Sequence, residues 1–365
     1  IMCTTADMWL WFPERWKKRH SNWPKSVARS WRLTSRLLPA RRHRLLKRNV
    51  TTNRQPLGVC RHLCLPAWVN SKIQIKLHLT ITTMNNLIVR ALTGAVFVAV
   101  LVGGTLFSPM TFTLLFAVVT GLTTWEFSHN VNSYAGASVN KLINTVAAVY
   151  LFVAFGGFCA DLVPSRAFIP YLVSIIYMLV SELYLQKADP LKNWAYAFAS
   201  QIYVALAFSL LNVLAFQYDP MTNKTAFEPI YPLSVFLFLW TSDTGAYCCG
   251  SLLHKYFPAK LFERISPNKS WVGSIGGGGL CLVAAAVLGH FNPTLLTLPQ
   301  WLGLGAVVCV FGTWGDLVES LFKRQLGIKD SGHVLPGHGG MLDRFDSALL
   351  AIPAAVLYLY SVQAF

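Results

Sequence analysis

Nine charged side chains are concentrated between Gly315 and Ser347, in a stretch that lies between long apolar segments. They make up 9 of the 27 charged residues that follow residue 83. A charged side chain near a membrane-spanning helix is costly, so this cluster is a candidate functional site. Its members are Asp316, Glu319, Lys323, Arg324, Lys329, Asp330, Asp343, Arg344 and Asp346.

The first part of this stretch has the spacing of a polar helix face. If residues 312–324 are helical, five side chains share one face, with the carboxylates one or two turns from the cations. They are Asp316, Glu319, Ser320, Lys323 and Arg324.

A glycine-rich run, Pro336–Gly340, follows and cannot form a regular helix. Backbone with so little side chain lets N–H groups approach an anion such as a phosphate. Carboxylates, cations and a flexible loop are the groups needed to hold a metal–nucleotide complex. An ordinary glycine-rich loop between two membrane helices is the simpler alternative.

The pattern S-L-F-K-R-x4-K-D-S-G-x2-L-P-G-H-G-G-x-L-D-R-F-D, from Ser320 to Asp346, resembles the signature of the phosphatidate cytidylyltransferases (CDP-diacylglycerol synthases). Nearly every fixed position of that signature is filled. The resemblance implies an enzyme that makes CDP-diacylglycerol and pyrophosphate from CTP and phosphatidate.

A second polar constellation lies in residues 240–276. Asp243 stands at the end of an apolar segment, and a basic loop with Ser266, Lys269 and Ser270 follows. Lysine and serine at a helix start could bind phosphate oxygens, although an ordinary loop is an equal alternative. For Gly276–Gly279 we favour close helix packing.

The same family accounts for this stretch, because W-x-S-D-T-G-A-Y followed by S-P-x-K-[ST]-W-x-G resembles its second conserved block. The chain departs from the family with Asn268 in place of Lys, Ser270 in place of Thr, and Val272 in place of Glu or Gln. Ser270 keeps a hydroxyl group, whereas Asn268 and Val272 receive no family role.

Both substrates are anionic, so the site must neutralise repulsion and align the reacting centres. The resemblance implies Mg²⁺ held by Asp316 and Asp343, with Lys323 and Arg344 as further catalytic residues. Binding of the nucleotide and its metal is expected from the remaining candidates. These are Asp243, Ser266, Lys269, Ser270, Arg324, Lys329, Asp330, His338 and Asp346.

Two other function classes fit parts of the sequence. An ion- or proton-coupled transporter would use Asp243, Asp316 and Asp343, but no internal repeat is present. A lipid kinase that uses CTP would share the nucleotide chemistry and transfer the terminal phosphoryl group instead. Membrane lipids are expected as partners and nucleic acid is not, while a homodimer is left open.

The composition of the segments that carry these residues indicates a membrane protein. The chain is 54% hydrophobic and 13% charged, with a mean hydropathy of +0.46; a soluble domain has roughly a quarter charged residues. We predict an all-α, polytopic integral membrane protein with about nine transmembrane helices. The predicted spans are 88–107, 110–126, 142–160, 167–186, 194–216, 229–248, 272–291, 301–322 and 347–364.

The distribution of lysine and arginine between the connecting loops predicts how these spans are oriented across the membrane. If the first span starts in the cytoplasm, cytoplasmic connections hold twelve Lys and Arg, and opposite connections hold only Arg166 and Lys224. The active-site loops 249–271 and 323–346 are therefore expected in the cytoplasm, and 217–228 and 292–300 on the other side. In a bacterium this predicts the inner or plasma membrane.

The net charge of +16 belongs almost entirely to residues 1–83, which hold 17 Lys and Arg but only Asp7 and Glu14. This segment is rich in Trp and Arg and has no periodicity. It is either a basic arm for anionic lipid or RNA, or, as we favour, non-native or disordered sequence ahead of a start at Met84. The chain after it divides into N-terminal transmembrane helices (84–228) and a C-terminal catalytic region (229–365).

Overall fold

The computed structural model describes residues 91–362 except 220–222, 254, 333 and 335–338. All described residues belong to the second of two compact units, Lys72–Phe365. The predicted segment 1–83 lies outside them. After a helix at Ala91–Phe107, the helices are α4 (Pro109–Tyr134), α5 (Lys141–Cys159), η2 (Ser165–Phe168), α6 (Ile169–Tyr184), α7 (Pro190–Ser200), η3 (Gln201–Leu206), α8 (Ala207–Ser209), α9 (Leu211–Ala215), α10 (Ile230–Leu253), α11 (Trp271–Phe291), α12 (Leu298–Leu326), α13 (Leu342–Phe345) and α14 (Ala348–Ser361).

The all-α, membrane-like architecture is confirmed for the described residues. Six helices there are long and apolar enough to cross a membrane: α4, α5, η2 with α6, α7 to α9, α11 and α12. The other three predicted spans fall on the helix Ala91–Phe107, on α10 and on α14. The total of nine spans stays a prediction.

Local sequence explains where these helices begin and end. A side-chain oxygen of the residue before the helix caps the N-terminus of α4 (Ser108), α5 (Asn140), α7 (Asp189) and α11 (Ser270). Proline occupies the first turn of α4 and α7, where no intrahelical N–H bond is lost. Gly327 ends α12 in the left-handed conformation, with φ of 71°.

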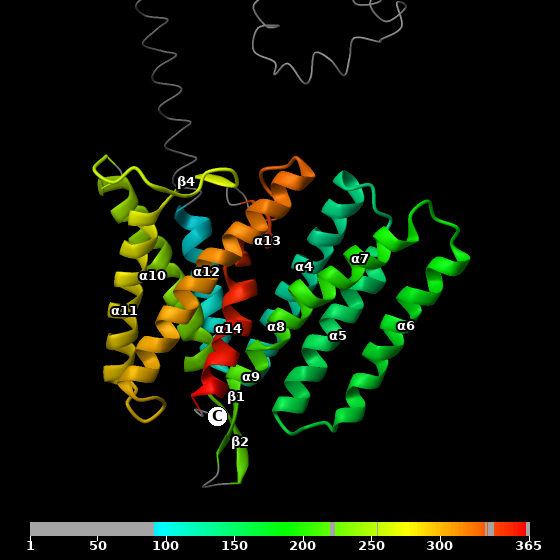
Figure 1. Cartoon of the computed structure of the whole chain (residues 1–365). Helices are drawn as coiled ribbons and strands as arrows, with labels where there is room; N and C mark the ends of the chain where they lie inside the picture. The colour runs from blue at the N-terminus through cyan, green and yellow to red at the C-terminus, as the bar shows by residue number, and fades with distance from the viewer. Residues whose placement is uncertain (1–90, 220–222, 254, 333, 335–338, 363–365) are drawn as a thin grey trace, which may run out of the picture. The chain divides into compact units, whose positions relative to one another are not determined.

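Two short hairpins interrupt the helical pattern. β1 (Phe216–Asp219) pairs with β2 (Lys224–Phe227), and β3 (Lys260–Phe262) pairs with β4 (Ser266–Ser270), both antiparallel. Figure 1 places β4 at the end of the bundle where α12 ends, and β1 and β2 at the opposite end. The phosphate-binding loop predicted around residues 266–270 is therefore a strand that leads directly into α11.

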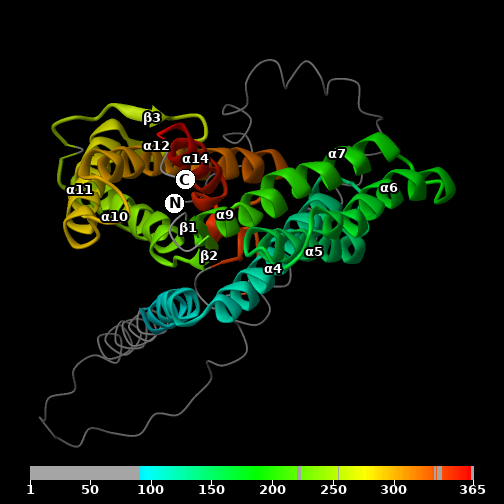
Figure 2. The ribbon, with the colours of Figure 1, turned by 90° about the horizontal axis from the view of Figure 1, so that it is seen from below.

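Helices α10, α11, α12 and α14 pack on one another, and α4 to α9 form a neighbouring group (Figure 2). Aromatic side chains join the two groups. Phe116 stacks on Phe236 with ring centroids 5.6 Å apart, and Phe127 stacks on Phe322 at 4.8 Å. Such pairs add to the burial of large apolar surfaces, so one continuous core connects α4 with α10 and α12.

Glycines bring α10 and α11 into backbone contact. A Cβ atom on Gly277 would lie 2.5 Å from the carbonyl oxygen of Ser242, and one on Gly276 would overlap Cys249. The packing role predicted for this glycine run is confirmed at these two positions. Gly279 has open space around it. The close contact fixes Asp243, on α10, beside the start of α11.

Candidate active site

The polar face predicted for residues 312–324 lies on α12 and is helical as expected. The Ser320 hydroxyl donates to Asp316 Oδ1 at 3.2 Å, and Lys323 Nζ lies 2.6 Å from Glu319 Oε2. The Glu319 side chain is fully buried, so its ion pair with Lys323 is shielded from solvent. The face therefore presents Asp316 one turn from a buried ion pair.

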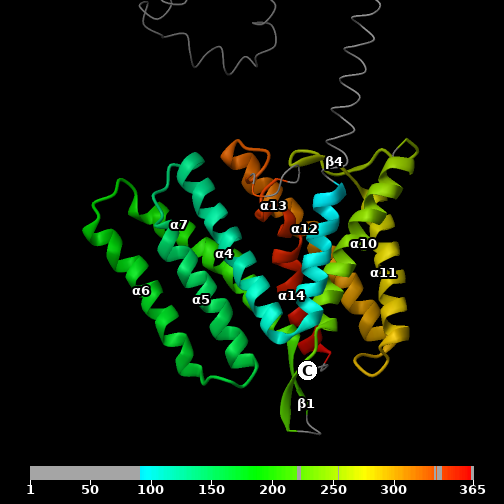
Figure 3. The ribbon, with the colours of Figure 1, turned by 180° about the vertical axis from the view of Figure 1, so that it is seen from behind.

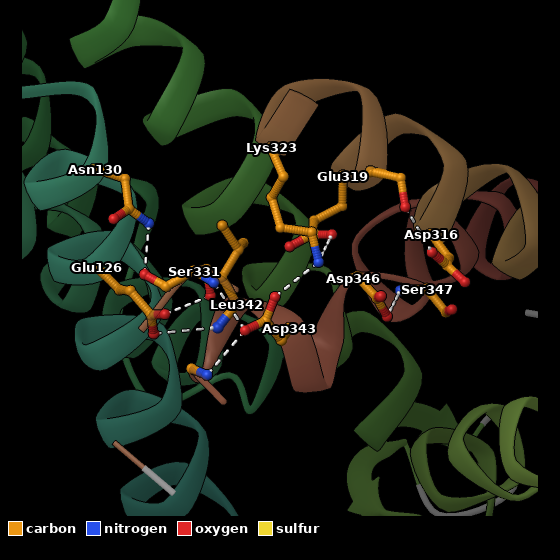
Figure 4. Close-up of polar contacts among 12 residues, drawn as sticks. Glu126, Asn130, Asp316, Glu319, Lys323, Ser331, Leu342, Asp343, Asp346 and Ser347 are labelled. Atoms are coloured by element: carbon orange, nitrogen blue, oxygen red, sulfur yellow. Dashed lines mark hydrogen bonds and ion pairs between the residues drawn. The ribbon is translucent and has the colours of Figure 1, made fainter. Parts of the chain in front are cut away.

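Asp343, on α13, accepts three hydrogen bonds that close the signature stretch into a loop. Its donors are Lys323 Nζ at 2.8 Å and the backbone N–H groups of Ser331 and Gly340, both at 2.9 Å (Figure 4). Burial alone would raise the pKa of Asp343, but these donors outweigh burial and hold its pKa below the usual range. Asp343 is thus ionised and holds both sides of the loop to α12.

A buried carboxylate that the sequence analysis did not select, Glu126 on α4, holds the same loop from the other side. It accepts hydrogen bonds from the Ser331 hydroxyl, from Met341 N at 2.6 Å and from Leu342 N at 3.3 Å. One helical turn further on, Asn130 Nδ2 donates to the carbonyl of Ser331 at 2.7 Å. Figure 4 shows both α4 side chains pointing at the loop.

One signal in the sequence could have identified Glu126. It ends the predicted span 110–126, and an ionisable residue within a membrane segment is a functional candidate by default.

Gly315 lets α12 approach the chain between α13 and α14. A Cβ atom there would lie 2.7 Å from the carbonyl oxygen of Asp346 and 2.9 Å from Ser347 Cα. Real side chains do not tolerate such distances to backbone atoms, so this position requires glycine. The contact brings Asp316, the next residue on α12, towards Asp346.

Five of the predicted site residues line one cavity of about 320 Å³. Its wall contains four carboxylates and one guanidinium: Asp243, Asp316, Asp343, Arg344 and Asp346. They come from α10, α12, α13 and the turn before α14, so residues more than 100 positions apart in sequence meet here. We call this the carboxylate cavity.

A second polar cavity, of about 250 Å³, adjoins it and shares Asp243 and Ser347 with it. Lys269 and Ser270 line it at the end of β4, next to the N-terminus of α11. Lys269 Nζ also lies 2.5 Å from Asp316 Oδ2, so it reaches across to the first cavity. We call this the hairpin cavity.

Neither cavity is lined by Ser266, Arg324, Lys329 or Asp330. Ser266 lies in the β3–β4 hairpin opposite Phe262. His338 lies outside the described residues. The structure thus gathers Asp243, Lys269, Ser270, Asp316, Asp343, Arg344 and Asp346, and Lys323 joins them through its contact with Asp343.

The carboxylate cavity carries excess negative charge. Burial, together with the negative charges of Asp316 and Asp243, raises the pKa of Asp346 to about 7, although Ser347 N–H and Lys323 oppose the rise. Within the described part of the chain, no three His, Cys, Asp or Glu side chains are close enough to form a metal-binding group. A cation or a phosphate-bound metal would relieve the repulsion among these carboxylates.

Comparisons with known proteins show which proteins this chain resembles. The model of the cytidylyltransferase family matches residues 88–362. The phosphatidate cytidylyltransferase of Staphylococcus aureus (strain COL) is 32% identical over 242 residues, which are 66% of this chain and 86% of that protein. The Staphylococcus haemolyticus protein of the same name is 34% identical over 241 residues, again 66% and 86% of the two chains. The Staphylococcus epidermidis protein is 42% identical over 151 residues, 40% of this chain and 56% of that one.

Proposed function

Since the chain belongs to the cytidylyltransferase family, we propose that it transfers the cytidylyl group of CTP to phosphatidate, giving CDP-diacylglycerol and pyrophosphate. The observation that carries this function is the junction of two polar cavities at Asp243, one with four carboxylates and an arginine, the other with Lys269 and Ser270 at a helix start. Both cavities lie in a multi-pass membrane protein, where phosphatidate is available.

In this reaction a phosphate oxygen of phosphatidate attacks the α-phosphorus of CTP. The bond from that phosphorus to the β-bridging oxygen breaks, and pyrophosphate leaves. The attacking phosphate is already ionised near neutral pH, so no general base is needed. The protein's task is to hold two anions in line and to offset their repulsion.

We assign the nucleotide phosphates to the hairpin cavity. Lys269 supplies a positive charge there, and the N-terminus of α11 supplies a partial one. The Ser270 hydroxyl accepts from Gly273 N at 3.1 Å, which leaves its own proton free to be donated. Asn268 lines the same cavity but carries no charge to contribute.

Arg344 is the cation that we assign to the lipid phosphate. It lines the carboxylate cavity, and none of the ion pairs among the described residues involves it. Lys323, by contrast, lies between Glu319 and Asp343. Its contacts favour a positioning role, in which it holds Asp343 and the loop to α12.

The side chains of the carboxylate cavity fit a Mg²⁺ ion. The donors are all oxygen atoms, as this ion prefers, and among the described residues only Lys269 makes an ion pair with Asp316. A bound Mg²⁺ ion would neutralise the triphosphate and stabilise the leaving group. The family resemblance implies Asp316 and Asp343 as the two ligands, and this assignment stays a prediction. Because Asp343 already accepts three hydrogen bonds, the contacts favour Asp346 as the second ligand beside Asp316.

Two substitutions separate these assignments. Asp346→Asn is expected to raise the Mg²⁺ concentration for half-maximal activity by at least about tenfold, since a metal-site carboxylate is lost. Asp343→Asn is expected to lower activity at every Mg²⁺ concentration, because it weakens the closure of the loop. The measurement is initial rate against Mg²⁺ concentration. The reverse result would support Asp343 as the ligand.

The function itself is tested with purified protein, labelled CTP and phosphatidate, followed by identification of the lipid product. Labelled CDP-diacylglycerol with released pyrophosphate is the expected result. A phosphorylated lipid with released CDP would instead identify a lipid kinase. Absence of any lipid product would refute the proposed transfer.

We further propose that both polar cavities face the cytoplasm, where CTP is found. The β3–β4 and β1–β2 hairpins lie at opposite ends of the bundle (Figure 1). In a cysteine-free background, a cysteine at position 260 is therefore expected to react with an impermeant maleimide only from the cytoplasmic side. A cysteine at position 224 is expected to react only from the other side. Labelling of both from one side would contradict the topology.

A further inference from the structure

An apolar cavity of about 440 Å³ lies between the helix Ala91–Phe107 and α4. Val96 and Phe97 line it from the first helix, and Leu115 and Val118 from α4. Met341 and Phe345 also line it, next in sequence to the part of α13 that carries Asp343 and Arg344. We call it the apolar groove.

The two helices that line the apolar groove make a close contact where they join. A Cβ atom on Gly104 would lie 2.6 Å from Leu115 Cδ2, and the Thr111 hydroxyl donates to the Gly104 carbonyl at 3.0 Å. From this close contact the two helices diverge towards the end of the bundle that carries the polar cavities, with α13 and α14 behind them (Figure 3). The two helices that line the groove are therefore held together at one end and separate towards the proposed site of reaction.

The groove adjoins the carboxylate cavity. Thr93 and Phe97 line both, and Phe345, which follows Arg344 in the chain, packs edge-on against Phe97 with ring centroids 5.8 Å apart. A molecule with its anionic group at Arg344 would thus have its apolar part directed between the two helices.

The other side of the groove is open. Val96 and Val100 are 54% exposed, and Val118 is 60% exposed. On a membrane-spanning protein, exposed apolar side chains at this depth face lipid rather than water. A lipid molecule could therefore enter the groove sideways from the bilayer.

We propose that this groove holds a fatty acyl chain of phosphatidate while Arg344 holds its phosphate. This inference rests on the proposed function and adds to it the path of the lipid. Bilayer chains are as apolar as the groove, so moving an acyl chain between them gains little free energy. The groove contributes by orientation: it fixes the lipid phosphate relative to the nucleotide.

The test is Val118→Trp, which fills the open side of the groove without touching a charged residue. Leu114→Trp is the matched control, since Leu114 is also 60% exposed on α4 but does not line the groove. Both purified variants are assayed with CTP and long-chain phosphatidate in mixed micelles. Phosphatidate with eight-carbon chains serves as a second substrate that needs less of the groove.

Val118→Trp is expected to raise KM for long-chain phosphatidate about tenfold, with KM for CTP unchanged and a smaller rise for the short-chain lipid. Leu114→Trp is expected to match the unmodified chain in all three constants. Equal behaviour of the two variants, or an equal loss with both lipids, would overturn the proposal. Failure of the unmodified chain to form CDP-diacylglycerol would instead refute the proposed function, so the two failures are distinguishable.

Discussion

Replacing Asp316 with Asn is expected to lower kcat at least about 100-fold, the scale of losing one electrostatic stabiliser. The substitution keeps the shape of the side chain and removes its charge. Asp316 lines the carboxylate cavity and makes the ion pair with Lys269 that connects it to the hairpin cavity. Its loss should therefore affect both the proposed metal site and the placement of the nucleotide.

The measurement is turnover at saturating CTP, phosphatidate and Mg²⁺, with the amount of protein in the membrane determined in parallel. Asp330→Asn is the comparison, because Asp330 is exposed and lines neither polar cavity. We expect its effect to stay within a few-fold. Near-normal turnover of Asp316→Asn at saturating Mg²⁺ would exclude Asp316 as a metal ligand.

Glu126→Gln is expected to lower kcat/KM about 10- to 100-fold, although Glu126 lines neither polar cavity. Its carboxylate accepts from Ser331, Met341 and Leu342. Glutamine keeps the volume, but it has one acceptor oxygen in place of two and no charge, so at least one of the three hydrogen bonds is weakened or reversed. Losing a hydrogen bond to a charged group costs about 1.5–3 kcal/mol, and each 1.4 kcal/mol is tenfold. Of the contacts from α4 to the loop, only the hydrogen bond from Asn130 to Ser331 would then keep its full strength.

Glu182→Gln is the matched control. Glu182 is also a buried glutamate in a helix, and it accepts from Lys187 at 2.7 Å and Asn193 at 2.9 Å, away from either polar cavity. Both variants should unfold at a lower temperature than the unmodified chain. Only Glu126→Gln should lose catalytic efficiency in the protein that remains folded. An equal loss of catalytic efficiency in the two variants would show that Glu126 only stabilises the fold.

Residues close in sequence were predictable in detail. The face that carries Asp316, Ser320 and Lys323 follows from helical periodicity alone, and the structure confirms it. The glycines that bring α10 and α11 together were also recognised by type and spacing. In both cases one local rule determines the outcome.

Contacts across long separations were not predictable in the same way. Glu126 and Ser331 are 205 positions apart, and no local pattern connects them. The predicted span 110–126 stops where polar residues begin, yet α4 continues to Tyr134, where the buried Ser128 is paired with Asn144 on α5 and the buried Asn130 with Ser331. Hydropathy measures how apolar a segment is, and it does not detect polar side chains that are paired inside the protein.

The contact at Gly315 has a consequence for how the site tolerates change. There the backbone of α12, which carries Asp316, lies directly against the backbone of Asp346 and Ser347. Contacts between backbone atoms therefore set the distance between these two segments, and side chains that could shift to new rotamers do not. Even one added methyl group would move α12 away from Asp346, and no repacking nearby could restore the spacing. A tightly constrained position of the site is therefore one that carries no functional group. Any redesign of this active site must take the separation of Asp316 and Asp346 as given.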